Sequence, residues 1–157
     1  MKKFFLMGVS LLLIVSCDPA RVYDKNEEFS DRNWPVDQTP EFEFDIENAD
    51  ISYDLYVNVR NEVSYANANL YFTYYLTDTL GNLLEKKLVS EFLFDKKTGK
   101  PFGNSVLGDI YDHRIPVLKK YVFKAPGRYV MRYEHYMRTD SLPGILGVGL
   151  RIEKSNP

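Results

Sequence analysis

The sequence predicts an all-β protein, an antiparallel β-sandwich of jelly-roll type, behind a cleaved signal peptide. Aromatic residues make up 15% of the 157 residues, and Tyr and Phe favour strands over helices. Apolar and polar residues alternate through seven or eight segments, and turn residues separate these segments from one another. No segment has the period of an amphipathic helix, and half-buried strands in this number are typical of two packed antiparallel sheets.

Residues 1–16 have the layout of a secretory signal peptide, with two lysines before an apolar stretch that is short for a membrane span. The sequence Leu-Ile-Val-Ser-Cys over 13–17 resembles a bacterial lipobox, and its Cys17 is the only cysteine of the chain. We therefore predict that cleavage makes Cys17 the N-terminus and that its thiol carries diacylglycerol with fatty acids such as palmitate. The alternative is an ordinary thiol inside a leader.

The lipid is the predicted membrane contact, because the mature chain is mildly acidic and gains nothing from anionic headgroups. We expect a lipid-anchored protein of the cell envelope that faces the periplasm. Asp18 follows the lipidation site, and in some bacteria an Asp there retains lipoproteins at the inner membrane. That rule is not universal, so the inner and the outer membrane both stay open.

The mature chain divides into residues 17–38, a predicted tether and ordered arm that starts at the lipidated cysteine, and residues 39–157, the predicted sandwich domain. The arm is polar, and its Trp34 is more often a core residue than a ligand platform. The predicted strands of the domain lie at 41–46, 53–60, 70–76, 83–89, 92–95, 121–123, 129–135 and 148–152. Turns are expected at 79–82, 97–100 and 125–127, and a long loop over 100–118, where Pro and Gly interrupt any period.

Composition and motifs argue against several classes of protein. A formal charge of −2 provides no basic field for nucleic acid. One cysteine and two histidines leave no internal disulfide and little material for a zinc site or a Cys-His nucleophile pair. The chain has no nucleophile elbow, phosphate-binding loop or His-Glu-x-x-His motif, and the glycines at 144, 147 and 149 are interpreted as a turn signal. The sequence therefore predicts no enzyme, no metal and no cofactor.

Two polar clusters are candidates for a partner or ligand surface. Asp109, Asp112 and His113 could bind a hard cation or act in acid–base chemistry, although such a cluster in a loop is usually solvated or caps a turn. The second cluster is His135, Arg138 and Asp140. Its simpler interpretation is a buried, hydrogen-bonded histidine and an Arg–Asp pair that holds the following turn.

A third candidate surface is rich in tyrosine. Tyr71 and Tyr75 share one face of a predicted strand, and Tyr56 lies on the strand before it. Such rings could stack on sugars. Burial on both faces of a central strand is the commoner explanation of consecutive tyrosines.

The chain resembles the GldH family of gliding-motility lipoproteins from its leader to its C-terminus. The most specific block is His-Tyr-Met-Arg-Thr-Asp-Ser-Leu-Pro-Gly-Ile-Leu-Gly-Val-Gly-Leu over 135–150. Leu-Phe-Asp at 93–95, Thr-Gly-Lys-Pro at 98–101 and Gly-Asp-Ile-Tyr-Asp at 108–112 add to the match. The resemblance implies an envelope lipoprotein of gliding motility, in bacteria where gliding is tied to type IX secretion, and it implies no catalytic activity.

Three functional hypotheses follow. The leading one is a non-enzymatic, membrane-anchored β-sandwich that binds or stabilises other envelope proteins of the gliding and secretion machinery. The alternative is a surface carbohydrate-binding module that uses the tyrosines. A metal-assisted hydrolase that uses Asp109, Asp112 and His113 ranks last.

Overall fold

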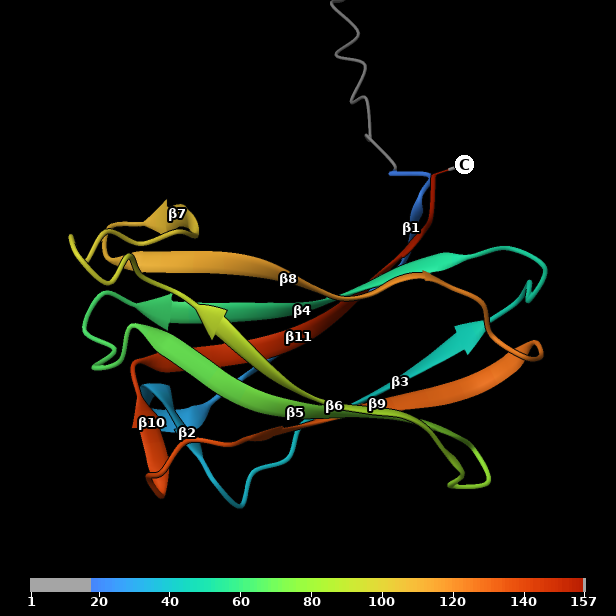
Figure 1. Cartoon of the computed structure of the whole chain (residues 1–157), viewed down its shortest axis with the longest axis horizontal. Helices are drawn as coiled ribbons and strands as arrows, with labels where there is room; N and C mark the ends of the chain where they lie inside the picture. Colours follow the sequence, from blue (N-terminus) through green and yellow to red (C-terminus); the bar gives the residue numbers. More distant parts are fainter. Residues whose placement is uncertain (1–17, 157) are drawn as a thin grey trace, which may run out of the picture.

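The computed structural model describes residues 18–156, so the predicted signal peptide and Cys17 lie outside the described residues. Within 18–156 the chain forms two packed antiparallel sheets and one short two-stranded sheet (Figure 1). The elements are β1 (Arg21–Glu28), η1 (Ser30–Arg32), β2 (Asn33–Pro35), β3 (Glu41–Ile46), β4 (Tyr53–Glu62), β5 (Asn69–Asp78), β6 (Leu83–Phe92), β7 (Asn104–Leu107), β8 (Ile110–Tyr121), β9 (Gly127–His135), β10 (Ser141–Pro143) and β11 (Ile145–Lys154). No helix in this part of the chain has the length and apolar character that crossing a membrane requires.

The strand order confirms the predicted β-sandwich and its jelly-roll type. The five-stranded sheet has the order β1-β11-β4-β8-β7, and the four-stranded sheet has the order β3-β9-β5-β6. The antiparallel pairs are nested in sequence: β5 with β6, β4 with β8, β3 with β9, and β1 with β11. Successive pairs alternate between the two sheets, which is the topology of a long hairpin wrapped into a jelly roll.

The period-two pattern correctly identifies the buried faces of β3, β4, β5 and β9. Every second residue of β3 and of β4 is buried, as the alternation over 41–46 and 53–60 predicts. Trp34 is buried in the core, where its indole Nε1 donates a hydrogen bond to the Gln38 carbonyl at 2.8 Å. Tyr133 is buried between the sheets, and its hydroxyl donates to the Gly149 carbonyl at 3.3 Å.

The prediction of a long loop over 100–118 is wrong, because this segment holds β7 and most of β8. Among the Pro and Gly residues that suggested a loop, Pro116 lies inside β8, although a proline cannot donate a backbone hydrogen bond to a neighbouring strand. β7 pairs only with residues 110–112 of β8, so at Pro116 β8 is the edge of the sheet, where a proline is tolerated. The strand expected at 92–95 is also absent: β6 ends at Phe92, and Phe94 makes only an isolated bridge to Pro101.

The polar segment expected to be a tether and arm contributes to the sandwich. Its residues 21–28 form β1, which pairs with β11 along the five-stranded sheet. Its residues 33–35 form β2, which pairs with β10.

Gly147 and Gly149 lie inside β11, so their interpretation as a turn signal is wrong, whereas Gly144 adopts a positive φ of 89° in the turn before the strand. A Cβ on Gly149 would stand 2.5 Å from the Lys25 carbonyl oxygen of β1 and would overlap the Asn26 amide oxygen. The two glycines therefore leave gaps on the outer face of β11 that side chains of the neighbouring strands occupy.

We expect Gly149→Ala to weaken the pairing of β1 with β11, because the added methyl group overlaps β1. The free energy of unfolding should fall by about 1–3 kcal/mol, the usual range for overpacking. Hydrogen exchange should show lost protection in residues 21–28 while the β5–β6 hairpin stays protected. Unchanged protection of β1 would contradict this prediction.

Candidate functional site

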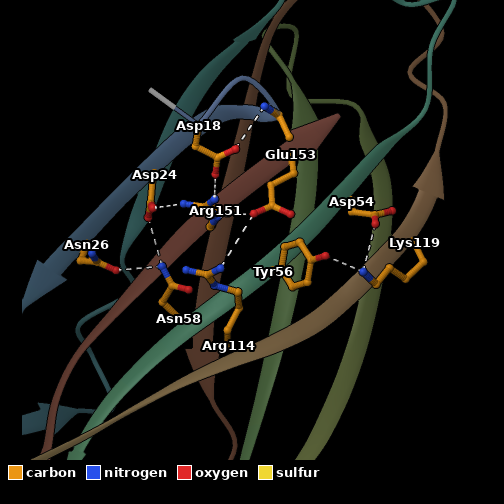
Figure 2. A network of polar contacts seen from close by, with 11 residues as sticks. Asp18, Asp24, Asn26, Asp54, Tyr56, Asn58, Arg114, Lys119, Arg151 and Glu153 are labelled. Carbon is orange, nitrogen blue, oxygen red and sulfur yellow. Dashed lines mark hydrogen bonds and ion pairs between the residues drawn. The ribbon is translucent and has the colours of Figure 1, made fainter. Parts of the chain in front are cut away.

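The outer face of the five-stranded sheet carries polar side chains that bond to one another across β11; we call this set the polar ladder (Figure 2). It consists of Asp18, Asp24, Asn26, Glu28, Asp54, Tyr56, Asn58, Arg60, Asp112, Arg114, Lys119, Arg151 and Glu153. In register, Asn26 of β1 and Asn58 of β4 flank Gly149. The Asn58 amide donates to the Asn26 amide oxygen at 3.1 Å, over the place where a side chain at 149 would stand.

The next row of the polar ladder repeats this arrangement with charges. Glu28 and Arg60 flank Gly147, and the Arg60 guanidinium donates to the Glu28 carboxylate at 3.0 Å. Arg60 also donates two hydrogen bonds to Asp112 of β8, at 2.7 and 2.9 Å. This bidentate pair raises the pKa of Arg60 above its usual value.

Arg151 is the most buried charge of the polar ladder, with 8% of its side chain exposed. Its guanidinium donates to three carboxylates: Asp24 at 2.7 Å, Glu153 and Asp18. Burial acts to lower the pKa of Arg151, but these hydrogen bonds outweigh it and raise the pKa above its usual range. Asp18 is the residue next to the predicted lipidation site, so Arg151 fixes the start of the described chain on this sheet.

The far end of the polar ladder is closed by Asp54. Its carboxylate accepts hydrogen bonds from the Lys120 backbone N–H at 2.8 Å, the Ser155 hydroxyl at 2.7 Å and the Lys119 ammonium at 3.0 Å. Burial raises the pKa of Asp54, but these donors outweigh it and lower the pKa overall. Lys119 also donates to the Tyr56 hydroxyl at 2.6 Å and lies 4.2 Å from the centre of its ring.

A shallow groove of about 360 Å³ runs along the polar ladder, between β1 and β8. Each charged group that lines the groove is paired with an opposite charge of the polar ladder. The polar ladder therefore links four strands of the sheet through its paired charges.

The structure separates Asp109, Asp112 and His113. Asp112 pairs with Arg60 on the outer face, whereas His113, its neighbour on β8, points inward and is buried, because adjacent strand residues face opposite sides. Asp109 is exposed in the turn between β7 and β8. Within residues 18–156, no group of three His, Cys, Asp or Glu side chains is arranged to hold a metal ion.

The second cluster is also separated. His135 is buried against Trp34, with ring centres 5.3 Å apart, and its Nδ1 accepts a hydrogen bond of 3.4 Å from the Met137 backbone N–H. Burial lowers the pKa of His135, as it does for His113. Among the described residues, no ion pair joins Arg138 to Asp140.

The three tyrosines do not form one platform. Tyr56 belongs to the five-stranded sheet, whereas Tyr71 and Tyr75 lie on the outer face of the four-stranded sheet. The Tyr75 ring is approached by Arg132 at 4.2 Å and by Lys86 at 4.9 Å, and its hydroxyl donates to Glu134 at 2.7 Å. Cations therefore lie over the Tyr75 and Tyr56 rings that a sugar would need.

Tyr71 instead contributes to an apolar groove of about 480 Å³ at one end of the four-stranded sheet. We call it the Tyr136 groove; its lining is Asn67, Tyr71, Leu88, Tyr136, Met137, Arg138 and Thr139. Of these lining residues, the sequence patterns pointed to Tyr71 and Arg138 but not to Asn67, Leu88, Tyr136, Met137 or Thr139. The available signal was the pair Tyr136-Met137 directly after a strand, since two neighbouring large apolar residues cannot both face the core of a sheet.

We expect Arg151→Met to lower the free energy of unfolding by about 3 kcal/mol or more, because it leaves partly buried carboxylates without their cation. The matched control is Arg128→Met, which removes an exposed arginine whose ion pairs with Glu43 and Asp45 are 3.8 and 3.3 Å long. Such surface pairs contribute less than about 1 kcal/mol. Equal losses in the two variants, measured by denaturant unfolding, would contradict the central role of Arg151.

Stability should decrease as the pH falls below 6.5, the ordinary pKa of histidine. Burial lowers the pKa of His113 and His135 in the folded state, so below 6.5 the unfolded chain binds protons that the folded chain does not. Denaturant midpoints should therefore be lower at pH 5 than at pH 7. The His113→Gln, His135→Gln double variant should show a smaller difference, and an unchanged difference would contradict this origin.

Among solved structures, the chain is similar to a chain in the structure of infectious bursal disease virus Gx strain, with a TM-score of 0.37 and 10% identity. It also resembles dimeric latent PorU from Porphyromonas gingivalis, with a TM-score of 0.36 and 11% identity. The likenesses cover 85% and 99% of this chain but only 30% and 14% of those chains, and at such scores they carry no functional argument.

Two relatives match nearly the whole chain. The gliding motility lipoprotein GldH homolog of Christiangramia forsetii is 30% identical over 159 residues, which cover 97% of this chain and 95% of that protein. The gliding motility lipoprotein GldH of Flavobacterium johnsoniae is 25% identical over 158 residues, which cover 96% of each. The family model named GldH lipoprotein matches residues 21–152. The chain therefore belongs to the GldH lipoprotein family of gliding-motility proteins, and this membership implies a membrane-anchored protein of the cell envelope.

Proposed function

We propose that this lipoprotein is anchored through acylated Cys17 and acts in gliding motility without catalysis, by holding an envelope partner protein in the Tyr136 groove. In bacteria where gliding is tied to type IX secretion, the partner belongs to that machinery. The observation that carries the proposal is the exposed apolar surface of this groove.

The Tyr136 groove has the composition of a protein-binding surface. Tyr136 is 69% exposed, Leu88 48% and Tyr71 38%, and they come together from three separate parts of the chain. Tyrosine, methionine and arginine are the residue types enriched at protein interfaces. Arg138 is the one charged residue of the lining, so the groove fits a partner segment that presents an apolar side chain beside an acidic one.

The groove is also preformed, which lowers the entropic cost of binding. After β9 ends, the Tyr136 backbone N–H donates to the Tyr71 carbonyl at 2.7 Å. The Tyr71 backbone N–H in turn lies 3.3 Å from the Met137 sulfur. These contacts fix the segment after β9 against β5, so both walls of the groove are held by the sheet.

The state of the titratable groups supports a non-enzymatic role. The polar ladder pairs its own charges, and the two histidines are buried on the inner side of their strands. A general acid or base needs to reach a substrate proton, but the histidines point into the protein and the carboxylates of the polar ladder are paired with cations. The arrangement of the candidate rings does not favour carbohydrate binding, since they are divided between two sheets and cations lie over Tyr56 and Tyr75.

We expect Leu88→Asp and Tyr136→Ser to abolish surface spreading when they replace the wild-type chain in its own host, because they place polar groups in the groove. Leu83→Asp is the matched control: Leu83 is 55% exposed on the same strand, β6, but does not line the groove. Spreading and export of a type IX cargo would be scored together, with immunoblots showing equal protein levels. Full spreading by the two groove variants would overturn the proposed docking site.

The anchor is tested separately with Cys17→Ala, exported and present at the wild-type level. We expect this variant to lose membrane association in fractionation and to fail to restore spreading. Full motility and secretion with a lipid-free chain would show that anchoring through Cys17 is dispensable. That result would contradict the proposed anchoring. The docking role of the Tyr136 groove would still be tested by the groove variants.

A further inference from the structure

The hairpin of β7 and β8, with the loop before it, exposes apolar side chains that the proposed function does not use. Phe102 is 60% exposed, Val106 51% and Leu107 77%, all within six residues. All four residues of β7 are exposed, because this short strand is the edge of its sheet and pairs only with the start of β8. Neighbouring exposed apolar side chains of this kind mark a surface that contacts a partner or a membrane.

Lysines lie beside these apolar residues. The turn over 95–100 exposes Lys96, Lys97 and Lys100. The Asp95 carboxylate does not neutralise them by side-chain pairing, since it accepts hydrogen bonds from the Lys97 and Thr98 backbone N–H groups at 2.8 Å. Exposed lysines next to apolar side chains are the composition of surfaces that bind anionic membranes.

The position of the β7 surface relative to the start of the described chain favours a membrane as its contact. β7 and the beginning of β1 both lie along the upper edge of the molecule in Figure 1, at the two ends of the five-stranded sheet. Arg151 holds Asp18 against the outer face of the same sheet, so no described spacer separates the sandwich from residue 17. A bilayer that holds the N-terminal end therefore also faces β7.

We propose that Phe102, Val106 and Leu107 form a second, non-covalent contact with the membrane that carries the anchor, with Lys97 and Lys100 at its anionic headgroups. This inference rests on the proposed anchoring at Cys17. The mild negative charge of the whole chain conceals this contact, because attraction to headgroups depends on the charge nearest the surface. With two points of contact, the five-stranded sheet faces the bilayer, and the Tyr136 groove on the other sheet faces away from it.

The test uses the full chain, purified from membranes of its host and reconstituted in vesicles. Because Cys17 is the only cysteine and its thiol is acylated, Leu107→Cys introduces a single free thiol for a fluorescent label. The matched control is Leu80→Cys, since Leu80 is 86% exposed in the turn between β5 and β6, at the opposite edge in Figure 1. Vesicles of phosphatidylethanolamine and phosphatidylglycerol would contain lipids brominated on the acyl chain, which quench a label at the interface.

We expect the label at 107 to lose about half of its fluorescence or more, since interfacial side chains reach roughly 5–10 Å into the headgroup and acyl boundary. The label at 80 should keep its fluorescence, and adding Lys97→Glu with Lys100→Glu should reduce the quenching at 107. Equal fluorescence at 107 and 80 in chains that float with the vesicles would overturn this inference alone. Chains that do not float with the vesicles would overturn the anchoring and this inference together.

Discussion

The structure depends on β11, which is buried on both of its faces from Ile145 to Ile152. Its inner face carries the apolar side chains that pack in the core. Its outer face carries Gly147, Gly149 and Arg151. Side chains of β1 and β4 bond to each other over the two glycines, and Arg151 bonds to Asp24 of β1. Because β1 is an edge strand near the start of the described chain, the position of Asp18 on the sandwich follows from β11.

The cluster around Arg151 fixes position more than it adds stability. Removing a guanidinium and its carboxylates from water is costly, and such clusters are often no more stable than apolar residues of the same size. The pairing with Asp24 nevertheless helps to fix the register of β1, because a slip by one residue would turn this carboxylate to the other face. The cluster therefore specifies how the start of the chain leaves the domain, and for a membrane-anchored protein that sets its orientation.

The sequence alone was sufficient for the fold class, because β3, β4 and β9 each bury one face, so that buried and less buried residues alternate along them. The alternation over 41–46 and 53–60 correctly gave the faces of β3 and β4. It failed over 100–118, where β8 has no regular alternation of apolar and polar residues, contains a proline, and lacks a second neighbour beyond residue 112. It also separated residues 17–38 from the domain, since β1 is polar, although the backbone of β1 pairs with β11 along the sheet.

The candidate sites were decided by the tertiary structure. Asp112 and His113 looked like a cluster because they are neighbours in sequence, but a strand sends neighbours to opposite faces. Arg151 attracted no notice because Asp18, its partner, lies 133 residues away, and Leu88 joins Tyr136 only when β6 and β9 flank β5. What the sequence determined by itself was local: the alternating strands such as β3 and β4, and the residues by which the family was identified. Which side chains meet across strands was fixed only by the jelly-roll wrapping, since that pairs residues from opposite ends of the chain.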